Sequence, residues 1–251
     1  MSIFQLQQFA INQSRSGMKI CSDSLLFGAL IPVDGAQRIL DIGTGTGLLA
    51  LMQAQKSDAS IDSTLEVITA VEVTQAAAEE AQENFDNSPW SPIFELIEQD
   101  IQSFAEHNNT ASSALYDLII CNPPFFAEQT KTASHKPLRH TARHTDTLSF
   151  QDLIHSIDLL LTATGSAFIL LPVTALVDFS QRSLEKGFCL VQQIEIAETC
   201  EHHVKVALFE FKRVEGDTLM VNKRRINKFK QSNVHTDEVQ ALLRPFLLRY
   251  R

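Results

Sequence analysis

The chain has 251 residues, of which 44% are hydrophobic and 20% charged, and this balance excludes collagen, coiled coils and wholesale disorder. It contains no apolar run of about 18 residues, and its N-terminus lacks the charged-then-apolar pattern of a signal peptide. We therefore expect a cytoplasmic protein with no membrane span. The four cysteines form no C-x-x-C pair, which argues against a zinc site or a disulfide framework.

The net charge of −9 is unevenly distributed along the chain. Residues 1–120 hold 4 basic and 16 acidic residues, a charge of −12, whereas residues 121–251 hold 17 basic and 14 acidic residues, a charge of +3. Two stretches, residues 131–144 and residues 218–235, contain bases and no acids. Because counterion release is a local effect, each stretch could bind a polyanion; the alternative is a solvated loop.

Short apolar runs alternate with segments of helical periodicity, which is typical of an α/β fold with a mainly parallel sheet. In chain order, the expected strands are Arg38–Ile42, Val67–Val73, Ile93–Ile97, Tyr116–Cys121, Ala167–Leu171, Phe188–Ile196 and Val204–Phe211. The expected helices start at Leu48, run from Thr74 to about Phe85 and from Ser149 to Gly165, and cover Thr174–Lys186. The loop between the last two strands is too short for a helical crossover, so these strands should pair antiparallel. We predict a Rossmann-like, doubly wound, mostly parallel seven-stranded sheet with its last strand antiparallel, in one domain (residues 1–251) with an N-terminal extension (residues 1–35).

A glycine-rich turn follows the first expected strand, with the sequence Asp41-Ile42-Gly43-Thr44-Gly45-Thr46-Gly47. Alternate glycines let the backbone turn sharply and let a ligand lie against bare main chain. The spacing matches neither the G-x-G-x-x-G dinucleotide fingerprint nor a P-loop, which indicates a nucleoside-containing ligand without a pyrophosphate. The second expected strand carries Glu72 at its end, where a carboxylate can accept both ribose hydroxyls. The alternative is a purely structural tight turn.

Two further polar motifs lie at the carboxyl ends of expected strands. Asp100 follows the third strand, where it either accepts a hydrogen bond from an adenine amino group or caps the next turn. The fourth strand is followed by Asn122-Pro123-Pro124-Phe125-Phe126. An Asn side-chain oxygen and a proline-linked carbonyl can accept the two N–H bonds of a planar amine, and consecutive prolines hold such a loop extended.

The order and spacing of these motifs resemble those of the class I S-adenosylmethionine-dependent methyltransferases. The N-P-P-[FY] tetrapeptide is similar to the motif of enzymes that methylate a planar nitrogen. The resemblance is closer still to bacterial tRNA1(Val) (adenine-37-N6)-methyltransferases. It extends over residues 4–215 and includes Met18–Gly28, Gln82-Glu83-Asn84 and Asn87-Ser88-Pro89-Trp90. This sequence has Phe125 and Phe126 where that family is expected to have tyrosines, a change that keeps stacking and loses hydroxyls.

The resemblance implies an enzyme that uses S-adenosylmethionine to methylate the N6 amine of an adenine in tRNA. Residues 1–35 would cover the cofactor site. The residues implied for the cofactor are Lys19, Asp23, Asp41, Gly43, Thr44, Gly45, Gly47, Glu72, Val73, Asp100, Ile101 and Asn122. The residues implied for catalysis are Asn122, Pro123, Pro124 and Phe125, and those for RNA phosphates are Lys136, Arg139, His140 and Arg143.

No metal is implied, because the histidines lack ligand spacing and His202 and His203 would face opposite sides of a strand. The sequence leaves the oligomeric state open, with a monomer favoured. Lys19 and Asp23 have a second interpretation, a surface ion pair. Two other functions stay open at this point. One is a related N-P-P-[FY] enzyme that acts on guanine N2 of ribosomal RNA or on a protein glutamine amide, and the other is a non-catalytic cofactor- or RNA-binding module.

Overall fold

The computed structural model describes residues 2–15, 17, 19–61, 63–110, 115–123, 148–213, 220–231 and 233–250. Its centre is an eight-stranded sheet with the order β10-β8-β9-β7-β6-β3-β4-β5. The strands are β3 (Arg38–Ile42), β4 (Val67–Glu72), β5 (Phe94–Glu98), β6 (Tyr116–Cys121), β7 (Leu161–Pro172), β8 (Phe188–Ala197), β9 (Val206–Arg213) and β10 (Asn222–Asn227). Neighbours are parallel except at β9, which is antiparallel to both β7 and β8. The predicted fold class and the antiparallel pairing of the two late strands are therefore confirmed.

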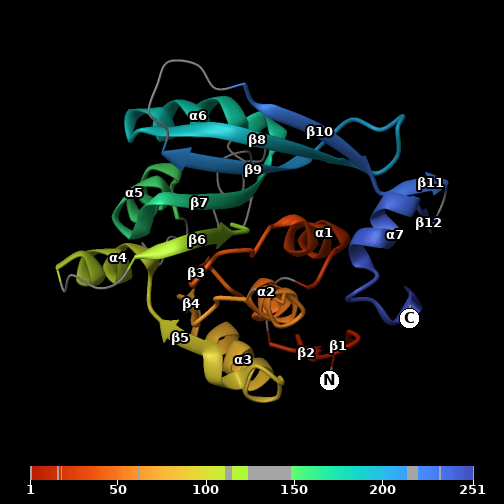
Figure 1. Ribbon diagram of the computed structural model, residues 1–251, viewed down its shortest axis with the longest axis horizontal. Coiled ribbons are helices and arrows are strands. Elements are labelled where there is room, and N and C mark those ends of the chain that lie inside the picture. Colours follow the sequence, from red (N-terminus) through yellow and green to blue (C-terminus); the bar gives the residue numbers. More distant parts are fainter. Residues whose placement is uncertain are drawn as a thin grey trace, which may run out of the picture.

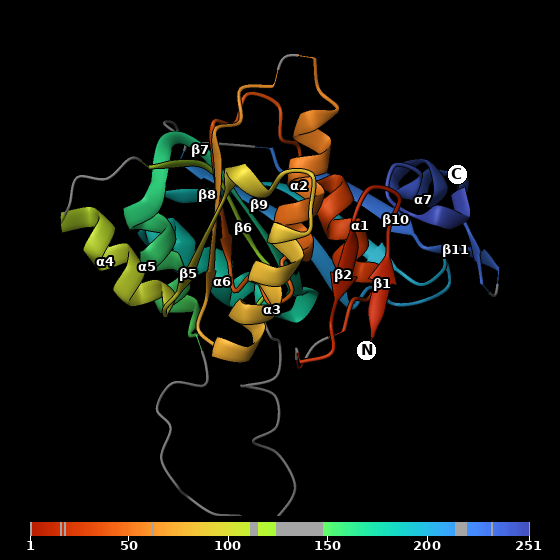
Figure 2. The same cartoon turned by 90° about the horizontal axis from the view of Figure 1, so that it is seen from below.

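Helices cover both faces of the sheet (Figures 1 and 2). One face packs against α1 (Ser22–Leu30), α2 (Leu48–Asp58), α3 (Gln75–Asp86) and α7 (Asp237–Leu243). The other packs against α4 (Ile101–Thr110), α5 (Phe150–Leu160) and α6 (Leu176–Glu185). Because strand side chains alternate, Ile39 joins the first hydrophobic core and Leu40 the second, which explains the near-continuous apolar runs. Within the described ranges, no helix is long and apolar enough to cross a membrane.

The terminal segments lie together beside the α1 face (Figure 1). The N-terminal hairpin consists of β1 (Ile3–Gln5) and β2 (Ala10–Asn12), and the C-terminal part contains the hairpin β11 (Phe229–Gln231) and β12 (Val234–His235) before α7. The backbone N–H of Gln7 donates to the carbonyl of Phe246 at 2.8 Å, and the Gln7 side chain donates to the carbonyl of Leu247 at 3.0 Å. Hydrogen bonds therefore join the two ends of the chain directly.

The prediction of seven strands was wrong by one strand, β10. This edge strand pairs parallel with β8, and its residues Asn222 to Arg225 are exposed. Only Ile226 is fully buried, so the strand has no apolar run to reveal it. Its polar sequence is typical of an edge strand, where charges oppose further pairing.

Two further differences lie between the third and fifth expected strands. Helix α4 was not predicted, because its C-terminal residues, His107 to Thr110, are polar. Helix α5 begins with the expected capping residue Ser149, whose Oγ accepts from the N–H of Asp152, but it ends at Leu160. Gly165 does not close this helix; it lies in β7 at an irregularity in the pairing with β6, where an added Cβ would lie 2.9 Å from the carbonyl oxygen of Asp117.

Candidate active site

Four parallel strands end at one edge of the sheet. The register places Ile42 of β3 opposite Val71 of β4 and Cys121 of β6, and Glu72 of β4 opposite Glu98 of β5. The segments that follow these residues are therefore neighbours. They are the glycine loop (residues 43–47), Val73, Gln99-Asp100 and Asn122-Pro123. The sheet thus brings together predicted site residues from four separate parts of the sequence.

The glycine loop requires glycine at three positions. Gly43, Gly45 and Gly47 have φ angles of 69°, 58° and 80°, in the left-handed region that other residues rarely adopt. A Cβ at Gly47 would lie 2.5 Å from the ring of Phe85 on α3, so this glycine allows close packing. A Cβ at Gly43 or Gly45 would meet no heavy atom within 4 Å among the described residues. The loop therefore borders open space at its first two glycines, as a ligand site requires.

Asp41 precedes the glycine loop and is fully buried. The hydroxyl of Thr44 donates to its Oδ2 at 2.7 Å, whereas its Oδ1 has no hydrogen-bond partner within the described part of the chain. Burial raises the pKa of Asp41 to about 7, although the hydrogen bonds from the Thr44 hydroxyl and the Ala50 backbone N–H act in the opposite direction. A buried carboxylate oxygen without a donor is unfavourable, so Asp41 is suited to a ligand that supplies one.

Glu72 holds the glycine loop in place, a role that the sequence did not reveal. Its Oε2 accepts from the backbone N–H of Gly45 at 3.0 Å, and its Oε1 accepts from that of Thr74 at 2.9 Å. A carboxylate oxygen can accept more than one hydrogen bond, so both atoms keep capacity for hydroxyl donors. The next residue, Val73, is 53% exposed, an apolar surface beside the same strand end.

Asp100 caps α4, one of the two interpretations that the sequence left open. Its Oδ1 accepts from the backbone N–H of Ser103 at 2.8 Å. The cap uses one carboxylate oxygen, so it does not conflict with a contact from the other oxygen to an adenine amine. Ile101, the first residue of the helix, is buried under this turn.

Asn122 and Pro123 follow β6 and are half-buried. Cys121, immediately before them, is opposite Ile42, so Asn122 and Gly43 continue from paired residues of adjacent parallel strands. Burial raises the pKa of the Cys121 thiol, which keeps it protonated and unreactive. The other predicted catalytic and RNA-binding residues lie outside the described residues: Pro124, Phe125, Lys136, Arg139, His140 and Arg143.

Lys19 and Asp23 have different partners from each other. The Lys19 ammonium donates to the backbone carbonyl of Gln13. Asp23, at the start of α1, accepts from the ammonium of Lys228 at 2.8 Å. Lys228 also contacts Glu198 at 2.5 Å and is itself only 6% exposed in its side chain. Burial lowers the pKa of Lys228, but the hydrogen bonds to the two carboxylates outweigh burial and raise it above its ordinary value.

Exposed bases of the stretch 218–235 have their described partners within the same chain. Arg224 pairs with Glu238. Lys230 contacts Asp237 at 2.7 Å. Arg225 donates to the backbone carbonyls of Thr199, Cys200 and His202, the last at 2.8 Å. These contacts favour a structural role for the stretch over a phosphate-binding surface.

The two adjacent histidines do not lie in a strand. His202 and His203 lie in the loop between β8 and β9, so the expectation that they face opposite sides of a strand was wrong. Among the residues that the structure describes, no three His, Cys, Asp or Glu side chains are grouped as a metal ion would need.

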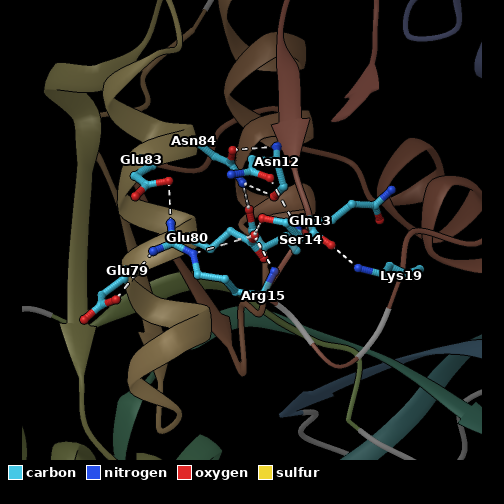
Figure 3. A network of polar contacts seen from close by, with 10 residues as sticks. Asn12, Gln13, Ser14, Arg15, Lys19, Glu79, Glu80, Glu83 and Asn84 are labelled. Carbon is cyan, nitrogen blue, oxygen red and sulfur yellow. Dashed lines mark hydrogen bonds and ion pairs between the residues drawn. The ribbon is translucent and has the colours of Figure 1, made fainter. Parts of the chain in front are cut away.

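A polar network near the glycine loop was missed at the level of sequence (Figure 3). Asn84 on α3 donates to the carbonyl of Thr46 at 2.9 Å and to that of Asn12 at 3.0 Å. The sequence assigns no role to Asn84 beyond the family resemblance of Gln82-Glu83-Asn84. The sequence pattern that could have indicated this role is that polar Asn84 falls on the same face of α3 as buried Ala77 and Ala81.

Comparison with known proteins agrees with this geometry. Residues 15–170 match the family described as "Methyltransferase small domain". A tRNA1(Val) (adenine(37)-N6)-methyltransferase from Shewanella woodyi is 34% identical over 252 residues, which cover 98% of this chain and 99% of the relative. The same-named protein from Bacteroides fragilis is 33% identical over 246 residues, with 98% of each chain covered.

Among solved structures, one described as a predicted O-methyltransferase from Agrobacterium tumefaciens matches with a TM-score of 0.61 and 19% identity. The match covers 88% of this chain and 94% of that one, and at this identity it shows the shared fold. The extent and identity of the two curated relatives show more than the fold. The chain belongs to the methyltransferase small domain family and, within it, to the tRNA1(Val) (adenine(37)-N6)-methyltransferases.

Proposed function

We propose that this enzyme transfers a methyl group from S-adenosylmethionine to the N6 amine of adenine 37 in tRNA1(Val), in the cytoplasm. One observation carries the proposal: the Asn122-Pro123 segment leaves β6 beside the glycine loop, since Cys121 and Ile42 are register partners. A group that can orient an amine therefore lies next to a loop that can hold a nucleoside. Methyl transfer requires the amine and the methyl group of the cofactor to be in contact.

The residues of the strand edge fit the cofactor. The open side of the glycine loop at Gly43 and Gly45 leaves room for it. The unpartnered Oδ1 of Asp41 can accept from a donor on its methionine part. Residues proposed to hold the methionine part are Asp41, Gly43, Thr44, Gly45 and Gly47; Glu72 would hold the ribose, Val73, Asp100 and Ile101 the adenine, and Lys19 and Asp23 would lie over the site. The cofactor supplies a methyl group bonded to a positively charged sulfur. The neutral thioether that remains after transfer is a good leaving group.

The N-P-P-F motif would present the target amine. The side-chain oxygen of Asn122 and the carbonyl of Pro123 would accept its two N–H bonds, with Pro124 keeping the loop extended and Phe125 stacked on the base. These hydrogen bonds stabilise the positive charge that develops on the nitrogen as its lone pair leaves the ring system. No general base is needed before methyl transfer, because the attacked carbon already carries a good leaving group.

The RNA would be held mainly by charge. Lys136, Arg139, His140 and Arg143 belong to the basic stretch that follows Asn122 in the chain, and they are proposed to contact tRNA phosphates. The target adenine must unstack to enter the site, which is easier in an anticodon loop than in a duplex. Replacing both Arg139 and Arg143 with Glu should raise the KM for tRNA and flatten its salt dependence; unchanged RNA affinity would place the docking surface elsewhere.

The proposed organisation is one methyltransferase domain, residues 1–251, in which residues 1–35 cover the cofactor site. No metal takes part in the proposed reaction, and a single chain is proposed to act alone. The contacts of Asn12 with Asn84 and of Asp23 with Lys228 support this organisation, since they attach both ends of residues 12–23 to the rest of the protein.

The test is methyl transfer from labelled S-adenosylmethionine to unmodified bulk tRNA, followed by identification of the labelled nucleoside. N6-methyladenosine supports the proposed reaction, and mapping to position 37 of tRNA1(Val) supports the substrate. N2-methylguanosine, or label found only in protein, overturns the substrate and leaves the fold and the amine-binding motif in place. The matched control is the same assay with tRNA that already carries the modification.

A further inference from the structure

Helix α3 presents two buried polar side chains to the N-terminal part of the chain. Glu80 and Asn84 are 0% and 4% exposed and lie one helical turn apart, on the same face of the helix. Polar groups at such depth are unfavourable unless they are hydrogen bonded. Both residues bind residues 12–15, which belong to a segment that we call the N-terminal loop (residues 12–20, described at 12–15, 17, 19 and 20).

Asn84 joins the N-terminal loop to the glycine loop through hydrogen bonds to Asn12, which Figure 3 shows, and to Thr46. Its Oδ1 accepts from the backbone N–H of Asn12 at 2.8 Å, and its Nδ2 donates to the carbonyls of Asn12 and Thr46 at 3.0 and 2.9 Å. One N–H partner and two carbonyl partners fix which end of the amide is which. A side chain with one acceptor and two donors is needed here, and Asp or Leu would leave both carbonyls without a partner.

The contacts of Glu80 attach the N-terminal loop a second time. Its Oε1 accepts from the backbone N–H of Arg15 at 2.8 Å and from the hydroxyl of Ser14 at 3.2 Å. The Arg15 guanidinium then reaches Glu83 at 2.5 Å and Glu79 at 3.5 Å (Figure 3). The latter pairs are exposed and contribute little each, so the buried contacts of Glu80 and Asn84 define the position of the loop.

Gln13 transmits this position to Lys19. Its side-chain Oε1 accepts from the backbone N–H of Ile20 at 2.9 Å, and its carbonyl accepts from the Lys19 ammonium. Hydrogen bonds therefore link Thr46 of the glycine loop to Asn84 and Asn12, and the peptide bond from Asn12 to Gln13 continues this connection to Lys19. The two segments that flank the proposed cofactor position are connected through one amide side chain.

We propose that Asn84 is a positioning residue that couples the docking of the N-terminal loop to cofactor binding at the glycine loop. The inference rests on the proposed function, which assigns the cofactor to the glycine loop. Coupling between two sites is reciprocal, so the cofactor should stabilise the docked loop as much as the docked loop strengthens cofactor binding. The effect reaches the cofactor only through backbone position, because the Asn84 side chain contacts Thr46 by its carbonyl.

The test compares Asn84→Asp with the wild type in two measurements that need no catalysis. Aspartate has nearly the same shape and keeps the acceptor for Asn12 but loses both donors. Calorimetry should show the Kd for S-adenosylhomocysteine raised about tenfold, as expected for two lost hydrogen bonds. Hydrogen–deuterium exchange of peptides over residues 8–20 should be slowed by S-adenosylhomocysteine in the wild type and no longer in the variant.

The matched control is Asn87→Asp. Asn87 is three residues further along, and its Nδ2 donates to the carbonyl of Glu83 within its own helix, at 2.6 Å. This variant should match the wild type in both measurements. If Asn84→Asp does not fold, the double substitution Ser14→Ala, Arg15→Ala removes side-chain contacts of the N-terminal loop and should raise the Kd about two- to threefold with faster exchange.

Four results would overturn the inference. Faster exchange with an unchanged Kd would mean that loop docking and cofactor binding are independent, and a lower melting temperature alone would indicate a purely structural residue. A raised Kd with unchanged exchange would mean that the effect does not pass through the N-terminal loop. Absence of S-adenosylhomocysteine binding by the wild type would instead overturn the proposed function, and the inference with it.

Discussion

Along the carboxyl edge of the sheet, the β3–β4 half carries the glycine loop, whereas the β8–β10 half carries the ion pairs around Lys228. The first half contains left-handed glycines beside open space, an unpartnered oxygen on buried Asp41 and the exposed side chain of Val73. In the second half, Lys228 is enclosed by two carboxylates and the hydroxyl of Ser22. Both halves are rich in polar groups; in the first the glycine loop borders open space, whereas in the second the ammonium of Lys228 is paired with two carboxylates.

The largest expected effect comes from Asn122→Ala on the glycine-loop half. Loss of the amine-binding oxygen should lower the single-turnover rate of methyl transfer about 10²- to 10³-fold. The Kd for S-adenosylhomocysteine should stay within about twofold, because the cofactor is held mainly by other residues. Asn87→Ala, at an exposed asparagine that ends α3, is the control. Equal losses of rate and cofactor affinity would show that Asn122 acts in binding instead of in transfer.

Asp41→Asn tests whether the buried acid of this half destabilises the protein. The folded pKa of about 7 lies above the ordinary value of 3.8, so between these pH values the folded protein retains a proton that the unfolded chain releases. Stability therefore falls as the pH rises through this window, by up to about 4 kcal/mol above pH 7. Urea unfolding without cofactor should show a drop from pH 5 to pH 8 in the wild type and a smaller drop in the variant.

The control for that measurement is Asp58→Asn on the exposed end of α2, which should keep the wild-type pH dependence. A pH profile of Asp41→Asn parallel to that of the wild type would mean that Asp41 is not held protonated by burial. The glycine-loop half, like the Lys228 half, would then contribute no pH dependence of stability near neutral pH.

Lys228→Met tests the satisfied half. Removing the ammonium leaves Asp23 and Glu198 facing each other without a cation, and we expect the free energy of unfolding to fall by about 2 kcal/mol, less than for a fully buried pair because both carboxylates are partly exposed. The folded pKa of Lys228 lies above its ordinary value of 10.5, so its contribution is complete below about pH 10 and should be the same at pH 6 and pH 9. Lys230→Met, in the exposed pair with Asp237, is the matched control.

The smallest expected effect is that of Arg224→Ala. Its pair with Glu238 is exposed on both sides, so the free energy of unfolding should change by about 0.5 kcal/mol or less. The affinity for tRNA should also change by less than about twofold, since the structure gives this residue an internal partner. A large loss of tRNA affinity would show that the β10 half also contacts RNA and would remove the contrast between the halves.

The sequence was informative where residues act through the backbone or through apolar runs. Gly43, Gly45 and Gly47 marked a turn whose left-handed conformation the structure confirms, and the apolar run before Asn122 placed that residue at a strand end. β10 was not predicted, because its exposed edge carries Asn222 and three basic residues and no apolar pattern distinguishes it from a loop. Helix α4 was not predicted, because its C-terminal end is polar.

Partners in space could not be read from the sequence at all. Asn84 and Thr46 are 38 residues apart, and Lys228 and Asp23 are 205 residues apart. Nothing in local periodicity records such pairs, because they arise only when the sheet sets the register of its strands. The roles of Pro124, Phe125 and the basic residues of 131–144 remain predictions, since they lie outside the described residues.

The hydrogen bonds from Gln7 to Phe246 and Leu247 bear on how the chain folds during synthesis. They close a loop of 239 to 240 residues, so their entropic cost is met only after most of the protein is already ordered. On the ribosome, the partner carbonyls do not exist until residue 247 has been added and has left the exit tunnel. The contacts of Gln7 with the C-terminal segment are therefore among the last to form, and a nascent chain lacking residues 244–247 should leave Gln7 without these partners, whereas Asn12 of the same hairpin can already bind Asn84.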